Sequence, residues 1–331
     1  MSTIYLCEQG SVVTKRNQRL QIIKEGQTLI DIPVIKIDKI FIFGNIQVTT
    51  QALALLLDHS IDVSYFTARG RLRGRLNSSM SKNIFLRLAQ YERWRDPDYK
   101  INICRAIVAS KLQNMKSVLQ RFLSNYPEEN FEKTFAVIDS GLEQLYEKNE
   151  ISSVVGLEGA SSGAYFSVFG RMFRQELQFT KRIKHPSPDP VNALLSLGYV
   201  MITNEIASLL EATAFDPFLG FMHGVKYGRK SLALDMVEQF RQPVIDLFTL
   251  RLANLKVFGE DDFHEIPEEG VHLTDEKFKI YLDLYEKRLN QKMSFNNSED
   301  SNWRTVFHHQ MQSLEKAILE GKEYQPYTAV L

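Results

Sequence analysis

The stretch DPVNALLSLGYVMITNEIASLL, residues 189–210, decides that the larger part of this chain is helical. Asp189 precedes Pro190, the order of a helix N-cap residue and a proline in the first turn. The aspartate can accept a backbone N–H of that turn, and proline lacks the N–H that would be left unpaired there. The pattern predicts a long helix that begins at this pair.

Helical spacing continues on both sides of this stretch. Ile84, Leu88 and Tyr91 recur at helical intervals, and so do the apolar residues of 101–123. Residues 277–289 and 303–319 are amphipathic. The segment EDDFHEIPEEG, residues 260–270, is expected to be an acidic connector, and EYQPYTAVL, residues 323–331, a loose tail.

The N-terminal residues have a different character. Short runs rich in Ile, Val, Tyr and Phe alternate with turn dipeptides such as Glu25-Gly26 and Gly44-Asn45. Strands are predicted at 4–8, 11–16, 19–25, 28–33, 39–43 and 61–66, with one helix at 51–60 capped by Thr49 or Thr50. The fold class is therefore α+β and multidomain. We expect a small N-terminal β-rich domain at 1–76, a polar linker at 77–81, and a larger all-α catalytic domain at 82–331.

Composition excludes several classes of protein. The chain has 331 residues, more than one compact core usually holds, and 44% of them are hydrophobic and 24% charged. No apolar run approaches about 18 residues, so no membrane span is expected. No signal peptide is visible at the N-terminus, and the two cysteines are far apart. These features favour a cytoplasmic protein without a disulfide framework.

The net charge of zero hides a segregation of charges. Residues 66–125 hold 13 Lys and Arg against three acids, whereas residues 257–301 hold 12 acids against five bases. A basic zone suggests a phosphate-bearing substrate, although solvated helix surface explains such a run equally well.

The stretch GFMHGVKYGRKSLALDMVEQF, residues 220–240, carries the chemistry. It places His223 in a glycine-rich turn, and Asp235 and Glu238 on one face of the following helix, which Ser231 is expected to cap and Pro243 to end or kink. Glu158 is expected in another glycine-rich turn. One imidazole with carboxylates suits Mg²⁺ or Mn²⁺, and such ions promote chemistry at phosphodiesters.

Each of these residues also has an ordinary structural explanation. His223 could only hydrogen-bond within its loop, Glu158 could serve a helix dipole, and Asp235 could pair with Arg229 or Arg241. Lys226, Arg229 and Lys230 on the same loop are expected to contact phosphate oxygens. Tyr165 and Tyr199 could stack on bases or fill the core, and Tyr199, on an apolar helix, favours the core.

Taken together, GLEGASSGAYF (156–166), residues 189–206 and GFMHGVKYGRKSLALDMVEQFRQPVIDLF (220–248) resemble the signature blocks of the CRISPR-associated protein one family. The resemblance covers essentially the whole chain. It implies a metal-dependent DNA endonuclease and integrase of spacer acquisition. Such a protein joins the 3′ ends of a captured duplex to the repeat array, with the 3′-hydroxyl as nucleophile.

The resemblance also assigns residues and partners. Its metal ligands fall on Glu158, His223 and Glu238, and Asp235 is expected to support Glu238 or to replace it. Asn192 and Arg229 match signature positions with roles in site support and DNA contact. The implied partners are double-stranded DNA, a second copy bound through the β domain, and CRISPR-associated protein two, with no membrane involved.

Two other functions remain open from the sequence alone. One is a non-catalytic DNA-binding scaffold that uses the basic zone, including Arg71, Arg73 and Arg75, and keeps the metal motif for structure. The other is a metal-dependent phosphohydrolase acting on small phosphoesters.

Overall fold

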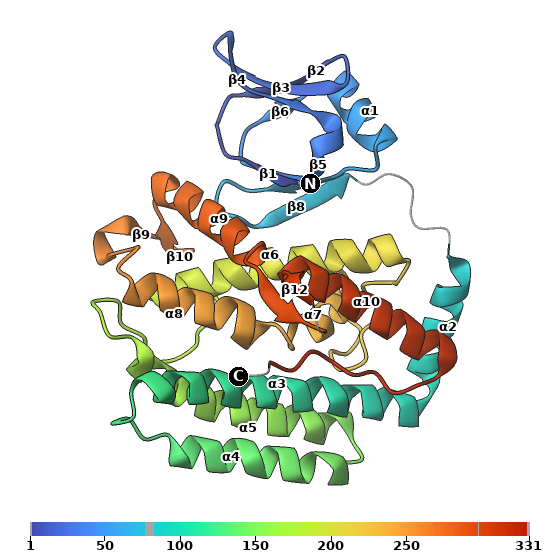
Figure 1. Cartoon of the computed structure of the whole chain (residues 1–331), viewed down its shortest axis with the longest axis vertical. Helices are drawn as coiled ribbons and strands as arrows, with labels where there is room; N and C mark the ends of the chain where they lie inside the picture. Colours follow the sequence, from blue (N-terminus) through green and yellow to red (C-terminus); the bar gives the residue numbers. More distant parts are fainter. Residues whose placement is uncertain (1, 77–82, 297, 330–331) are drawn as a thin grey trace. The chain divides into compact units, whose positions relative to one another are not determined.

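The computed structural model describes residues 2–76, 83–296 and 298–329, so the predicted linker at 77–81 lies outside the described residues. The chain forms two compact units (Figure 1). The first is Met1–Met80 with Phe278–Glu286, and the second is Ser81–Lys277 with Lys287–Leu331. The helix predicted at 277–289 thus forms, as α9 (Asp275–Leu289), but its central residues belong to the first unit.

Two four-stranded sheets form the first unit. One contains β1 (Ser2–Leu6), β5 (Ile37–Phe43), β7 (Asp62–Phe66) and β8 (Leu72–Leu76) in that order, with the first three parallel and β8 antiparallel. The other contains β4 (Gln27–Pro33), β3 (Arg19–Lys24), β2 (Val12–Arg16) and β6 (Gln47–Val48). Their apolar residues share one core, for example Leu20, Ile40 and Val63. Helix α1 (Thr50–Asp58) begins at Thr49, whose side chain accepts the N–H of Ala52, as predicted.

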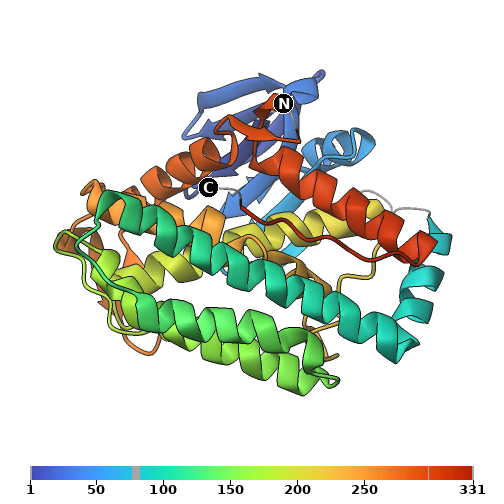
Figure 2. The same ribbon diagram turned by 60° about the horizontal axis from the view of Figure 1, so that its bottom comes forward.

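The second unit is mostly helical, which confirms the predicted fold class. Its helices are α2 (Ile84–Arg95), α3 (Pro97–Asn125), α4 (Glu132–Gln144), α5 (Ile151–Phe169), α6 (Pro190–Thr213), α7 (Ser231–Val237), α8 (Leu247–Asn254) and α10 (Trp303–Glu320). Helices α3, α4 and α5 lie side by side (Figures 1 and 2). Asp189 caps α6 by accepting the N–H of Asn192 at 2.7 Å, as the sequence predicts.

Two β-hairpins interrupt this helical unit. The segment expected to be an acidic connector contains β9 (Phe263–Ile266), which pairs antiparallel with β10 (Gly270–Leu273). A second pair is β11 (Met293–Phe295) with β12 (Ser298–Ser301). The helical domain is therefore not purely α, because short alternating segments between helices pair with each other.

Helix α6 is long and apolar enough to cross a membrane, with a mean hydropathy of 1.5 over its most apolar window. Polar residues such as Ser196 and Asn204 break its apolar run, which is why a search for uninterrupted runs misses it. However, 72% of that window is buried inside the protein, as in the core helix of a globular unit.

Residues 324–329 form a docked strap rather than the expected loose tail, and residues 330–331 lie outside the described residues. Asn114 on α3 donates to the carbonyl of Tyr327 at 3.1 Å and accepts the N–H of Ala329 at 2.7 Å. Gln239 accepts the N–H of Tyr327 at 2.6 Å, and its amide donates to the hydroxyl of Tyr324 at 3.0 Å. The strap therefore ties α3 to the segment that follows α7 (Figure 2).

We predict that Asn114→Ala lowers the free energy of unfolding of the second unit by about 1–3 kcal/mol. Asn114 is fully buried, and its loss leaves backbone groups of the strap without partners. Urea unfolding followed by tryptophan fluorescence measures this, because both tryptophans, Trp94 and Trp303, lie in this unit.

The matched control is Gln113→Ala, since Gln113 is exposed and bonds the strap through the side chain of Thr328 at 3.2 Å. That variant should stay within about 0.5 kcal/mol of the parent chain. Equal stabilities for the two variants would show that the strap is not held through Asn114.

Candidate active site

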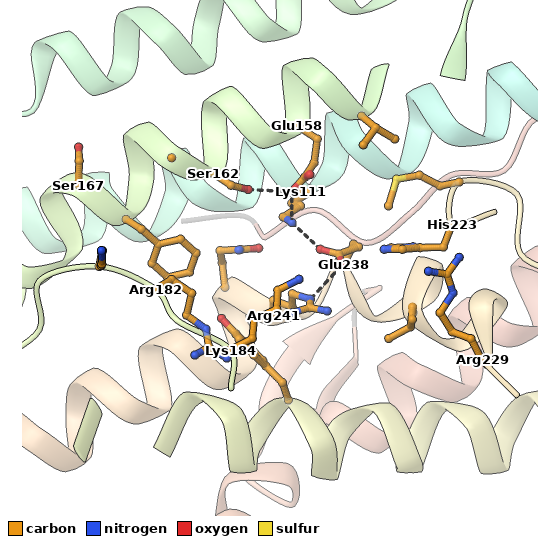
Figure 3. A pocket seen from close by; sticks show the side chains of 18 of the residues that line it. Lys111, Glu158, Ser162, Ser167, Arg182, Lys184, His223, Arg229, Glu238 and Arg241 are labelled. Atoms are coloured by element: carbon orange, nitrogen blue, oxygen red, sulfur yellow. Dashed lines mark hydrogen bonds and ion pairs between the residues drawn. The ribbon is translucent and has the colours of Figure 1, made fainter. Parts of the chain in front are cut away.

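A cavity of about 860 Å³ lies in the second unit (Figure 3). Its walls come from α3, α5, α6, the segment before α6, and the loop and helix that carry His223 and Glu238. Two carboxylates and one imidazole line it, those of Glu158, Glu238 and His223. Six cationic side chains also line it: Lys111, Lys181, Arg182, Lys184, Arg229 and Arg241. The cavity therefore combines a small acidic centre with a cationic surround, which suits a phosphate-bearing ligand.

Glu158 lies in the middle of helix α5, not in a turn as the sequence suggested. The glycines around it misled the prediction. A side-chain carbon placed on Gly156 or Gly159 would meet no atom within 4 Å, so these residues sit on an open helix face. Ser162, one turn later, donates to Oε1 of Glu158 at 2.7 Å and so fixes that carboxylate towards the cavity.

Glu238 directly follows α7 and precedes a π-helical turn, η4 (Arg241–Asp246), which contains Pro243. The Nζ of Lys111, from α3, donates to Oε2 of Glu238 at 2.5 Å and to Oε1 of Glu158. The Nε of Arg241 lies 3.0 Å from the other oxygen of Glu238. Two carboxylates from separate helices thus meet on one buried ammonium (Figure 3).

Opposite charges within this cluster favour the ionised forms of Glu238 and Lys111. Burial alone would raise the pKa of Glu238, but the Arg241 guanidinium and the Lys111 ammonium outweigh it and lower that pKa to about 2. Burial likewise acts to lower the pKa of Lys111, and the charges of Glu238 and Glu158 reverse this and raise it. Glu238 and Lys111 are therefore both charged at neutral pH.

Asp235 organises the loop that carries His223. It is fully buried, and its oxygens accept the backbone N–H groups of Phe221 at 2.6 Å, Met222 at 3.0 Å and His223 at 2.9 Å. It also lies 2.7 Å from Nδ1 of His223, which leaves Nε2 for the cavity. The suggested pairing of Asp235 with Arg229 or Arg241 is wrong, because backbone donors and the imidazole take both oxygens.

Gly220 allows this close approach. A side-chain carbon at Gly220 would lie 2.7 Å from backbone and side-chain atoms of Ser231 and 2.8 Å from Oδ2 of Asp235. No other residue fits at this position without displacing the start of α7. Trp94 donates to the Gly220 carbonyl at 2.9 Å and fixes the loop from the opposite side.

The remaining polar residues of the loop have separate roles. Ser231 is the first residue of α7 and does not cap it; its hydroxyl donates instead to the carbonyl of Gly224 at 3.1 Å. Arg229 lines the cavity and donates to the same carbonyl. Lys226 is exposed and lies outside the cavity lining, and Lys230 pairs with Glu211 at 2.5 Å. Of the three loop cations predicted to meet phosphate, the cavity thus includes Arg229.

Tyr165 and Asn192 are fully buried and lie outside the cavity lining. Stacking of Tyr165 on bases and contact of Asn192 with DNA stay predictions, and this burial does not favour them. Tyr165 packs among aromatic rings such as Phe169 on the buried side of α5. Asn192 lies at the start of α6, where it accepts hydrogen bonds from the backbone N–H of Ile183 and from Arg182 at 2.8 Å. Asn192 thus supports the site by positioning an arginine.

Tyr199 lies against two guanidiniums of the cavity lining, those of Arg182 and Arg241. Their central carbons lie 5.4 Å and 4.6 Å from the centre of its ring. Its hydroxyl donates to Asp246 at 2.5 Å, a carboxyl group whose pKa is raised to about 6 by burial. The prediction that Tyr199 fills the core is correct in part, since the ring is mostly buried but also lines the cavity.

Arg182 differs from Arg241 in its partners. Among the described residues, it donates to neutral acceptors only: the carbonyl of Ile183 at 2.6 Å, Asn192, and the hydroxyl of Ser196 at 3.0 Å. Burial lowers the pKa of Arg182. Its positive charge is therefore not cancelled by an ion pair.

Arg71, Arg73 and Arg75 belong to the first unit. Arg71 directly precedes β8, and the other two lie in it, on one face by alternation. Arg73 is exposed and Arg75 is half-buried with partners of its own. Their predicted contact with DNA stays a prediction.

Glu158, Glu238 and His223 are of the residue types that bind divalent ions, but the Lys111 ammonium lies between the two carboxylates. Carboxylate oxygens and an imidazole nitrogen are suitable donors for Mg²⁺ or Mn²⁺. Within residues 2–76, 83–296 and 298–329, no three His, Cys, Asp or Glu side chains stand close enough together to hold one ion. The Lys111 ammonium stands in for a cation between Glu158 and Glu238.

Sequence reasoning missed three residues of this site. Lys111 could have been found, because it interrupts the apolar helical series Ile107–Lys111–Met115, and a lysine on a buried face needs buried carboxylates. It was counted instead in the basic zone. Arg241 was considered only as a partner of Asp235. Arg182 lies in an irregular segment, and no local signal marks it.

Comparison with known proteins shows the family of this chain. The family model described as CRISPR associated protein Cas1 matches residues 4–287. A relative named CRISPR-associated endonuclease Cas1 1, from Moorella thermoacetica, is 30% identical over 300 residues, which are 88% of each chain. Another of that name, from Thermodesulfovibrio yellowstonii, is 28% identical over 98% of this chain and 99% of its own.

The solved structures point the same way. A casposase bound to integration product has a TM-score of 0.87 and 25% identity, and the match covers 99% of this chain and 93% of the casposase. The family match spans most of the chain and includes Glu158, His223, Asp235 and Glu238. From its fold, its cavity and these matches, the chain belongs to the CRISPR-associated protein Cas1 family.

Proposed function

We propose that this chain is a metal-dependent DNA endonuclease and integrase of CRISPR spacer acquisition, which joins the 3′ ends of captured duplexes to the repeat array by transesterification. One observation carries the proposal: Glu158, Glu238 and His223 face a cavity whose other charged residues are all cationic. Metal-assisted chemistry at a phosphodiester of DNA uses both groups of residues: carboxylates that hold a divalent ion, and cations that bind the flanking phosphates. The names of the relatives support the nuclease activity.

In this proposal, Glu158, Glu238 and the Nε2 of His223 would hold Mg²⁺ or Mn²⁺. When bound, such an ion polarises the phosphoryl oxygen and neutralises charge on the attacking and leaving oxygens. Asp235 keeps Nδ1 of His223 engaged, so that the imidazole presents its other nitrogen to the cavity. The nucleophile is a 3′-hydroxyl of the substrate or a water molecule, so the protein needs no side-chain nucleophile.

Arg182 and Arg229 would bind phosphates on either side of the acidic centre. Figure 3 shows Arg182 with Lys184 on one side of the carboxylates and Arg229 on the other. The hydrogen bonds recorded for both guanidiniums go to neutral partners, whereas Arg241 is paired with Glu238. A guanidinium without a carboxylate partner is the better site for a phosphate oxygen.

The alternative is a non-catalytic DNA-binding scaffold, and one observation favours it. The Lys111 ammonium already satisfies both carboxylates, as it would in a site kept for structure alone. Catalysis of strand transfer by the folded chain, lost on replacement of Glu158 or His223, decides against the scaffold.

We also propose double-stranded DNA, a second copy of this chain and CRISPR-associated protein two as partners, and the cytoplasm as the location. Family membership supports these partners. For the second copy, the β domain offers strand β4 at the edge of its sheet, with Leu29 and Ile30 exposed on it. An exposed apolar edge strand is a surface that a second chain can cover.

We predict that Glu158→Gln, His223→Ala and Glu238→Gln each abolish cleavage and strand transfer, because each removes a donor for the ion. An amide ligates Mg²⁺ or Mn²⁺ poorly but has nearly the volume of the carboxylate. Strand transfer of a fluorescent duplex, with Mn²⁺ and then with EDTA, measures this in variants shown to be folded by circular dichroism. Full activity in EDTA would refute the metal dependence, and full activity in one variant would remove that residue from the ligand set.

We predict a smaller loss, about 10–100-fold, for Asp235→Asn, because it acts on the imidazole and the loop rather than on the ion. Calorimetric titration with Mn²⁺ should show weakened binding for Asp235→Asn and lost binding for Glu238→Gln. The reverse order would make Asp235 the direct ligand.

We predict that Arg182→Gln weakens duplex binding and reduces the slope of log K against log salt concentration by about 0.9, the value for one lost phosphate contact. Binding in EDTA, where metal-dependent cleavage is blocked, measures this by fluorescence anisotropy. Arg174→Gln is the matched control, since Arg174 pairs with Glu129 at 2.7 Å outside the cavity lining.

The same titration with charge reversal at Arg71, Arg73 and Arg75 tests the basic face of β8. Unchanged slopes for that variant would make these three arginines ordinary surface charges. A slope for Arg182→Gln equal to that of the parent would remove Arg182 from the DNA-binding surface.

A further inference from the structure

Lys111 is a buried lysine in the middle of the candidate site. It is 6% exposed and belongs to the buried side of α3. A buried ammonium is costly unless its charge is matched and its N–H groups are bonded. Glu158 and Glu238 meet both needs, so the position of Lys111 depends on the two carboxylates that the proposed function assigns to a metal ion.

The charges at the site balance without any added ion. Two carboxylates, Glu158 and Glu238, face two cations, Lys111 and Arg241. Asp235 is not counted in this charge balance, because its two oxygens already bond three backbone N–H groups and the His223 ring. A divalent ion would thus enter a neutral cluster rather than one with two negative charges.

Three of the four carboxylate oxygens are occupied as well as neutralised. Both recorded bonds of Glu158 go to its Oε1, from Lys111 and from Ser162. Glu238 uses Oε2 for Lys111 and Oε1 for Arg241. An ammonium and a divalent ion on the same carboxylate oxygens would lie within a few ångströms of each other and repel strongly, since Lys111 and Glu238 are buried.

We infer that Lys111 is an internal counter-cation that holds Glu158 and Glu238 together and gives up at least one of them when a divalent ion binds. It is therefore a positioning residue that sets the affinity of the site for metal. The four-carbon stem of lysine permits this movement, and Lys111 borders the cavity into which its ammonium can turn. Arg241, anchored over the Tyr199 ring, stays with Glu238.

This inference rests on the proposed metal dependence, and Lys111→Met tests it. Methionine keeps the length and most of the volume but removes the charge. Calorimetric titration with Mn²⁺, without DNA, should show binding at least ten-fold tighter than in the parent chain. Lys116→Met is the matched control on the same helix, because Lys116 pairs at 2.5 Å with the surface residue Asp139. It should bind Mn²⁺ like the parent.

Thermal unfolding gives a second readout. Without metal, Lys111→Met should melt below the parent chain, because its two carboxylates lose their shared cation. Saturating Mn²⁺ should then raise its melting temperature more than that of the parent, since ligand binding stabilises in proportion to the logarithm of affinity. A variant that binds Mn²⁺ no more tightly than the parent would overturn the inference while leaving the metal dependence intact. Absence of Mn²⁺ binding to both the parent and Lys111→Met would refute the metal dependence and the inference together.

A charge-balanced double variant covers the case in which Lys111→Met does not fold. Lys111→Met with Glu158→Gln removes one charge of each sign and leaves Glu238 paired with Arg241. If Lys111 acts through its charge, the double variant should melt close to the parent. A double variant as unstable as Lys111→Met alone would show that Lys111 acts through packing, and this would overturn the inference.

Discussion

The buried ammonium of Lys111 between Glu158 and Glu238 is the interaction on which the site depends. The three residues come from α3, α5 and the end of α7, so their contact fixes the relative positions of three helices. None of the three charges is stable alone in a buried place, and removal of one partner leaves the others uncompensated. The same interaction that completes the core of the unit also gathers the two carboxylates at one point in the cavity.

The imidazole of His223 is positioned by a second set of hydrogen bonds, centred on Asp235. Asp235 gathers three consecutive backbone N–H groups and one ring nitrogen, and Gly220 lets the loop lie against α7 closely enough for this. The C-terminal strap bonds to two residues beside the acidic centre. These are Gln239, next to Glu238, and Asn114, on the helix of Lys111. The chemical groups of the cavity are thus held in place by neighbours that do not themselves face it.

The cations of the cavity fall into two groups with different consequences. Lys111 and Arg241 are engaged by carboxylates and belong to the acidic centre. Arg182 and Arg229 are held by neutral acceptors and keep their charge for an incoming anion. Asn192 prepares Arg182 for this role, because a buried amide that bonds both Ile183 and Arg182 fixes the segment in front of α6.

Sequence patterns were enough to predict the fold class, the two-part organisation of strands before helices and the Asp189 cap, and to single out the motifs that carry Glu158, His223 and Glu238. These follow from local periods, caps and turn residues, which act over a few positions. Packing between distant segments was needed to show that Glu158 lies on a helix, that Tyr165 and Asn192 are buried, and that residues 324–329 form a strap. It also decided that Lys111 joins the two carboxylates, which lie 47 and 127 positions away from it along the chain. The balance of buried charges depends on which helix faces pack together, and no local pattern contains that information.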